Sequence, residues 1–127
     1  MSKRQVLEGH GLPRHRNPIP AAVKIGGMVF SSAISGEDAE RGWLSPEPGE
    51  QVAQAFRNLR RAIELAGGTT DDIAKVTVYL RDMQHRELVN REWVAMFPDP
   101  HDRPARHTVR AELPEGMVVQ LEFIAVL

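Results

Sequence analysis

One polar residue on a strand-like segment near the C-terminus is the clearest candidate for chemistry. The segment "RPARHTVRAELP", residues 103–114, alternates in character, so Arg106 and Thr108 point to one side and His107 and Val109 to the other. An arginine directly behind Pro-Ala on such a strand has two interpretations. Arg106 either lies on a solvated surface or faces a cleft in which it binds an anion.

The composition limits which class of protein can hold this arginine. The chain has 127 residues, 42% of them hydrophobic and 26% charged, which is ordinary for a water-soluble globular protein. This length predicts one domain over residues 1–127, with residues 1–17 as an irregular N-terminal arm. The absence of cysteine excludes disulfides and thiol nucleophiles. No apolar run approaches the roughly 20 residues that cross a bilayer, so a cytoplasmic location without a membrane partner is expected.

Other candidate sites carry weaker signals. The presence of Ser32, histidines and acidic residues does not indicate a catalytic triad, because any protein of this size contains those residue types. The formal net charge is −1 and no strand has the aromatic pattern of RNA-binding sheets, so nucleic acid is not expected as a partner. Arg57, Arg60 and Arg61 are interpreted as a solvated helix face. Neither a metal nor a cofactor is expected, because these histidines show no metal-ligand spacing: His10, His15, His85, His101 and His107.

Hydrophobic spacing predicts the elements that must position these residues. Two apolar runs in "AAVKIGGMVFSSAIS" are split by Gly26-Gly27 and predict a hairpin, with a loop after it. Helical spacing predicts one helix in "EQVAQAFRNLRRAIELAGG", which the glycine pair ends, and another in "RDMQHRELVNREWVAMFPDP". Strands are expected in "TTDDIAKVTVYL" between the helices and in the last two segments, "ARHTVRAEL" and "MVVQLEFIAVL", which the turn "PEG" joins.

The order β-β-α-β-α-β-β predicts an α+β fold in which two helices cover one face of a single mixed sheet. The last strand indicates that the other face has no cover within the chain. One side of this strand is uniformly apolar, whereas the other is half apolar, with Val118, Gln120, Glu122, Ile124 and Val126. Burying a Val or Ile side chain contributes roughly 1.5–3 kcal/mol. Contact between the sheets of several copies is therefore expected, with any site on this shared face.

Several motifs, in the same order, resemble the reactive-intermediate deaminases of the RidA/YjgF family. They are "GGMVFSSAISG", "QVAQAFRNLRRAIELAGGTTDDIAKVTVYLRDM", "VNREWVAMF", "RPARHTV" and "LPEGMVVQLEFIAV". The resemblance extends over about residues 18–127. It implies a RidA/chorismate-mutase-like fold, a homotrimer, and a site in each cleft between subunits. It also implies hydrolytic deamination of small 2-imino or enamine carboxylic acids.

The resemblance also implies roles for individual residues. The arginine of the family's Pro-Ala-Arg segment binds the substrate carboxylate, and Arg106 is at that position. Its planar fork of N–H donors forms two parallel charge-assisted hydrogen bonds to a carboxylate. Ser32 matches the family serine, and the backbone N–H groups of Ala33 and Thr108 would frame the ligand. Asn90 matches the helix asparagine, with a buried amide that ties a loop as the alternative.

Three positions depart from the family pattern: Gln120, Ile19 and Thr108, the last of which is often cysteine in the family. The changes at Ile19 and Thr108 put the identity of the substrate in doubt. The family's deaminases carry a water-activating glutamate on the last strand, where this chain has Gln120. An amide can orient a water molecule but cannot accept its proton, and losing a general base typically costs about 10²–10⁴ in rate. Glu122 matches a second acidic position of the family and does not replace the first. A tyrosine that usually faces the ligand is Ile19 here.

Three hypotheses for function follow from these residues. The first is deamination of an imine or enamine acid, with Arg106 holding the carboxylate and Gln120 placing the water. The second is a binding module that holds a small carboxylate metabolite in the same cleft without deaminating it, with Gln120 as a polar interface residue. The third is a related hydrolysis or tautomerisation in a catabolic pathway.

Overall fold

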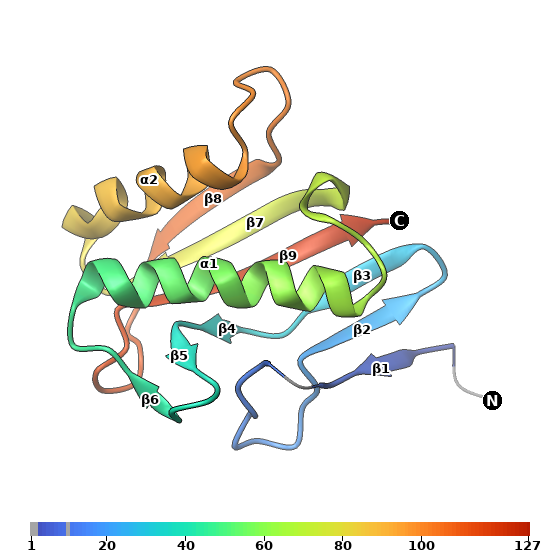
Figure 1. Cartoon of the computed structure of the whole chain (residues 1–127), viewed down its shortest axis with the longest axis horizontal. Coiled ribbons are helices and arrows are strands. Elements are labelled where there is room, and N and C mark those ends of the chain that lie inside the picture. The colour runs from blue at the N-terminus through green and yellow to red at the C-terminus, as the bar shows by residue number, and fades with distance from the viewer. Residues whose placement is uncertain (1–2, 10) are drawn as a thin grey trace.

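The computed structural model describes residues 3–9 and 11–127 and has two helices on one face of a sheet (Figure 1). The seven-stranded sheet has the order β1-β2-β3-β9-β7-β8, with β4 also paired to β9. β7 and β8 run parallel, and the other neighbouring strands are antiparallel. The predicted α+β fold is therefore confirmed. The strands of this sheet are β1 (Gln5–Leu7), β2 (Ala22–Ile25), β3 (Met28–Ser31), β4 (Ile34–Ser35), β7 (Ile73–Leu80), β8 (Ala105–Arg110) and β9 (Val119–Val126).

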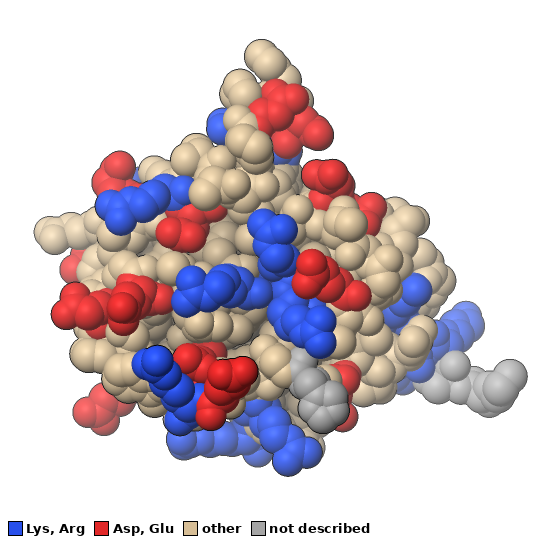
Figure 2. All heavy atoms as spheres, viewed as in Figure 1, with Lys and Arg blue, Asp and Glu red and all other residues tan. Residues whose placement is uncertain are grey.

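The two helices, α1 (Pro48–Leu65) and α2 (Arg86–Met96), turn charged side chains to solvent. Beyond the end of α1, Gly67 has a φ of 90°, the left-handed conformation that terminates many helices. Arg57 and Arg60 of α1 are exposed, as the interpretation of a solvated face predicts. Figure 2 shows Lys and Arg side chains interspersed with Asp and Glu over this helix-covered face, without an extended patch of one sign among the described residues.

Several short strands, and the order of the last three strands in the sheet, were not predicted from the sequence. The N-terminal arm, expected to be irregular, contains β1, which pairs with β2. The end of the segment predicted as a hairpin forms a further short strand, β4, and the expected loop after it contains a small separate sheet of β5 (Glu37–Asp38) and β6 (Trp43–Leu44). Strands of two or three residues are too short for alternation to identify them, so only backbone pairing does. β8 and β9 are consecutive along the chain, but β7 lies between them in the sheet.

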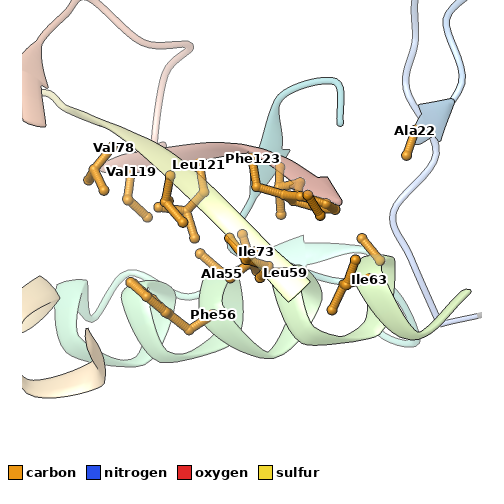
Figure 3. Packing of buried hydrophobic residues seen from close by; sticks show 14 of the residues in the cluster. Ala22, Ala55, Phe56, Leu59, Ile63, Ile73, Val78, Val119, Leu121 and Phe123 are labelled. Atoms are coloured by element: carbon orange, nitrogen blue, oxygen red, sulfur yellow. The ribbon is translucent and has the colours of Figure 1, made fainter. Parts of the chain in front are cut away.

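The core lies between α1 and the sheet (Figure 3). Figure 3 shows Ala55, Leu59 and Ile63 of α1 on the side that meets Leu121 and Phe123 of β9. The apolar residues predicted for α1 are almost fully buried, as is the predicted apolar side of β9: Val52, Phe56, Leu59, Ile63, Val119, Leu121, Phe123 and Ala125. These two stripes fix the orientation of β9 and, with it, the face on which Gln120 lies.

Two buried amides on α1 hold the loops that border the sheet. The Gln51 side chain donates from Nε2 to the carbonyl oxygens of Ser45 (3.0 Å) and Gly116 (2.9 Å), and its Oε1 accepts from the Val118 N–H (2.6 Å). The Asn58 amide donates to the carbonyl oxygens of Ser35 (2.9 Å) and Glu37 (3.0 Å). Both side chains are at most 2% exposed, so these bonds satisfy groups that water does not reach.

Gly36 allows the loop after β4 to approach α1 closely. A Cβ added at Gly36 would lie 2.1 Å from the Gln51 carbonyl oxygen, a backbone atom of α1 that cannot swing away. We expect Gly36→Ala to lower the free energy of unfolding by about 1–3 kcal/mol, because forcing a methyl group into a packed site displaces backbone. Urea denaturation measures this difference. Gly49→Ala is the control, since its added Cβ would meet only Leu88 Cδ2 at 3.8 Å; equal stability of the two variants would contradict the expectation.

Candidate functional site

Arg106 lies at the edge of the sheet, beneath α2. Its Cζ lies 5.2 Å from the centroid of the Trp93 ring, within the range of a cation–π contact. Its Nε donates to Thr108 Oγ1 at 2.9 Å. In the parallel register of β7 and β8, Arg106 is opposite Val76, which is fully buried on the helix-covered face. Packing against Trp93 and bonding to Thr108 together hold the guanidinium in a half-buried position.

The electrostatic surroundings of Arg106 favour an anion. Burial, first, and the positive charge of nearby Arg86, second, lower the pKa of Arg106 from its ordinary value. Within residues 3–9 and 11–127, no carboxylate forms a salt bridge with either arginine. A bound carboxylate would supply the missing counter-charge and accept hydrogen bonds from the free N–H groups of the guanidinium.

Asn90 lies on the face of α2 that carries Trp93. Residues 86, 90 and 93 are separated by four and three positions, so their side chains line one side of the helix. Asn90 is half-buried, and its side chain makes no hydrogen bond within the described part of the chain. Contact of Asn90 with a ligand stays a prediction, and its place on the Trp93 face of α2 is compatible with it.

Gln120 and Ala33 line a cavity of about 580 Å³ beside β4. Gln120 Nε2 lies 3.1 Å from Met117 Sδ, another lining atom, and residues 12–16 of the N-terminal arm form part of the same wall. Ser32 precedes Ala33 and donates its N–H to the Ala21 carbonyl (2.9 Å), which extends the β2–β3 pairing. These contacts place the Ser32–Ala33 backbone at the Gln120 cavity.

Ile19 lines a neighbouring hollow of about 870 Å³ and is 43% exposed. Both hollows share the wall formed by residues 12–15 and by Ala21. This contribution of the arm has no signal in the sequence, because residues 12–16 show neither a motif nor a period.

Within one chain, Arg106 and Gln120 do not meet. Gln120 is opposite Tyr79 on the face that the helices leave open, whereas Arg106 is on the helix-covered face of β8, with β7 between them. The sequence-based expectation of a single site on the open face is therefore wrong for Arg106. Side chains of a strand alternate between the two faces, and the faces of β8 and β9 are set by their separate pairings with β7. The predicted site residues therefore fall into two groups, called candidate half-sites below: one with Arg106, Thr108 and Asn90 and one with Gln120 and Ala33.

The open face of the sheet is partly apolar, as predicted. Phe30 on β3 is opposite Ile124 on β9, and these side chains are 37% and 36% exposed. On the same face, Tyr79 donates its hydroxyl proton to Glu122 Oε1 at 2.7 Å. This hydrogen bond, followed by burial and the negative charge of Glu122, raises the pKa of Tyr79. This hydrogen bond holds Glu122 on the open face, on the same side of β9 as Gln120.

Two classes of feature are absent from the described residues. In the ranges 3–9 and 11–127, no group of three or more His, Cys, Asp or Glu side chains could hold a metal ion. His10 lies outside the described residues. Over the same ranges, neither helix has the length and apolar character needed to cross a membrane.

The fold and its half-sites define an α+β protein with an arginine at the sheet edge that has no carboxylate partner among the described residues, and with a cavity beside β4 that Gln120 lines. The chain belongs to the endoribonuclease L-PSP family, the RidA/YjgF group, whose family model matches residues 13–127. A RutC family protein from Aquifex aeolicus is 36% identical over 110 residues, which are 86% of this chain and 88% of the relative.

Two further comparisons include relatives with named activities or ligands. A 2-iminobutanoate/2-iminopropanoate deaminase from Salmonella typhimurium is 31% identical over 116 residues, covering 90% of this chain and 91% of that protein. The crystal structure of E. coli TdcF with bound serine superimposes with a TM-score of 0.90 at 25% identity, covering 97% of this chain and 98% of the other. The resemblance predicted from the motifs is therefore confirmed at the level of the family.

Proposed function

We propose that the protein hydrolyses small reactive 2-imino or enamine carboxylic acids to 2-oxo acids and ammonia. Water adds to the C=N carbon, the C–N bond breaks, and the nitrogen leaves as ammonia with the protons that water supplies. The observation that carries this proposal is Arg106, a half-buried guanidinium without a carboxylate partner among the described residues. Relatives about 30% identical are named as deaminases of such imines.

Arg106 would anchor the substrate carboxylate, with Thr108 and Asn90 beside it. Nε already donates to Thr108, which leaves the terminal N–H groups of the fork for the ligand. Holding the imine in one orientation raises the rate, because a bound and oriented reactant has already lost translational and rotational freedom before it reaches the transition state. Imine hydrolysis proceeds readily in water, so a modest catalyst is sufficient.

Gln120 would position the attacking water from a second copy of the chain. Two half-sites on opposite faces of one sheet cannot act on one small molecule, but a neighbouring copy can bring its Gln120 cavity to Arg106. The half-exposed apolar side chains of the open face supply the surface for such contact. A homotrimer with a site in each subunit cleft satisfies both requirements, in keeping with the family assignment.

The experiment that tests this proposal is ammonia release from freshly generated 2-iminopropanoate. We expect the wild-type protein to exceed the buffer rate and Arg106→Ala to lose roughly 10- to 100-fold in kcat/KM, because hydrogen bonds to charged groups contribute about 1.5–3 kcal/mol. Arg91→Ala is the matched control, an exposed arginine on α2 that lies off the face carrying Asn90 and Trp93. A wild-type rate equal to that of buffer would refute the proposed hydrolysis.

A second candidate function is favoured by Gln120. An amide in the position of the family's glutamate removes the group that accepts a proton from water. A protein with this residue can bind a small carboxylate metabolite at Arg106 without turning it over. Binding of 2-oxobutanoate by calorimetry, combined with an absence of imine hydrolysis, would identify this function.

A further inference from the structure

Arg86 is a second cation at the start of α2; it is exposed, and its positive charge lies near enough to lower the pKa of Arg106. It is the first residue of α2, and the helical spacing of residues 86, 90 and 93 places it on the side of α2 whose Trp93 covers Arg106. α2 and β8 run in opposite directions (Figure 1), so the start of α2 lies toward the C-terminal end of β8. The Arg106 side chain bends that way, because its Nε bonds Thr108, two residues further along β8.

No acidic side chain explains the position of Arg86. Residues three and four positions later, Val89 and Asn90, carry no charge, and Glu87 is adjacent in sequence and does not share its face. Asp82 accepts from the Gln84 N–H at 2.9 Å in the turn before α2. A cation in the first turn of a helix is also disfavoured by the helix dipole. Two like charges therefore lie at the same edge of the sheet, and neither has a carboxylate partner in the described ranges.

We propose that the Arg106 half-site takes a 2-imino dicarboxylic acid, with the carboxylate beside the imine on Arg106 and the second carboxylate on Arg86. This inference rests on the proposed hydrolysis and names its substrate class. The reaction is unchanged: water replaces the imine nitrogen, a 2-oxo dicarboxylate forms and ammonia leaves. The second carboxylate takes no part in bond making, and it offsets the charge of Arg86 while orienting the chain of the substrate between the two guanidinium groups.

Binding of the stable 2-oxo acids tests the second anion site without any need for catalysis. Calorimetry would compare 2-oxoglutarate, a dianion, with 2-oxobutanoate, a monoanion, on wild type, Arg86→Gln and Arg91→Gln. Arg91 is exposed on the same helix but off the face of Arg86 and Asn90, which makes it the matched control. We expect wild type and Arg91→Gln to bind the dianion about tenfold more tightly, and Arg86→Gln to lose that preference while binding the monoanion as before. Equal affinities in wild type, or a preference that survives Arg86→Gln, would overturn the inference.

Ammonia release from 2-iminoglutarate and 2-iminobutanoate separates this inference from the proposed function. Faster hydrolysis of the dianion that depends on Arg86 supports both. Hydrolysis of both imines at similar kcat/KM leaves the proposed function standing and refutes the dicarboxylate preference. Selective binding of the dianion without hydrolysis supports the second anion site and refutes the deaminase activity.

Discussion

Replacing Gln120 by glutamate is expected to raise ammonia release from 2-iminopropanoate by roughly 10²–10⁴, the usual contribution of a general base. Gln120 lines the cavity beside β4, and glutamate has nearly the same shape, so the substitution changes the chemistry of one atom and little of the packing. The new carboxylate could accept the proton of the attacking water, which the amide cannot. The rate of the variant should also fall as the pH drops toward the ordinary carboxyl pKa of about 4.3, because only the ionised form acts as a base.

The comparison requires the starting rate of the wild type and a surface control. Gln84→Glu makes the same chemical change at an exposed position and should leave the rate unaltered. A large gain from a wild-type rate near that of buffer would indicate that the native protein serves carboxylate binding rather than deamination. Unchanged hydrolysis in Gln120→Glu would show that this residue does not contact the water, which contradicts its proposed role.

Replacing Gln51 by leucine is expected to lower the free energy of unfolding by about 3 kcal/mol or more. The substitution removes the partners of two carbonyl oxygens and one N–H: Ser45, Gly116 and Val118. Each buried group left without a hydrogen bond costs about 1–3 kcal/mol. Gln51 is 1% exposed, so water cannot replace these partners without opening the contact between α1 and the 114–118 loop.

Urea denaturation followed by circular dichroism would measure the loss for Gln51→Leu. Gln84→Leu is the control, because Gln84 is exposed and its side chain makes no hydrogen bond within the described residues. A difference between the two variants of less than about 1 kcal/mol would contradict the expectation. It would show that the three backbone groups find other partners when the amide is removed.

The sequence by itself determined the features that depend on local periodicity. The apolar stripe of α1 and the uniform side of β9 predicted which faces are buried, since a helix repeats every 3.6 residues and a strand every two. The half-apolar side of β9 predicted an open sheet face, where Phe30 joins Ile124. The motifs and their order were sufficient to identify the family. They also singled out Arg106 and Gln120 as the residues most worth testing.

Only the tertiary structure decided where those residues lie relative to one another. β7 lies between β8 and β9, and the registers in which both strands pair with β7 place Arg106 and Gln120 on opposite faces of the sheet. Strand order and pairing register arise from contacts between distant segments, which no local period encodes. The same reason applies to β1, to the arm beside the Gln120 cavity, and to the position of Arg86 at the Arg106 half-site. The sequence determined which side chains are available, and long-range packing decided which of them share a site.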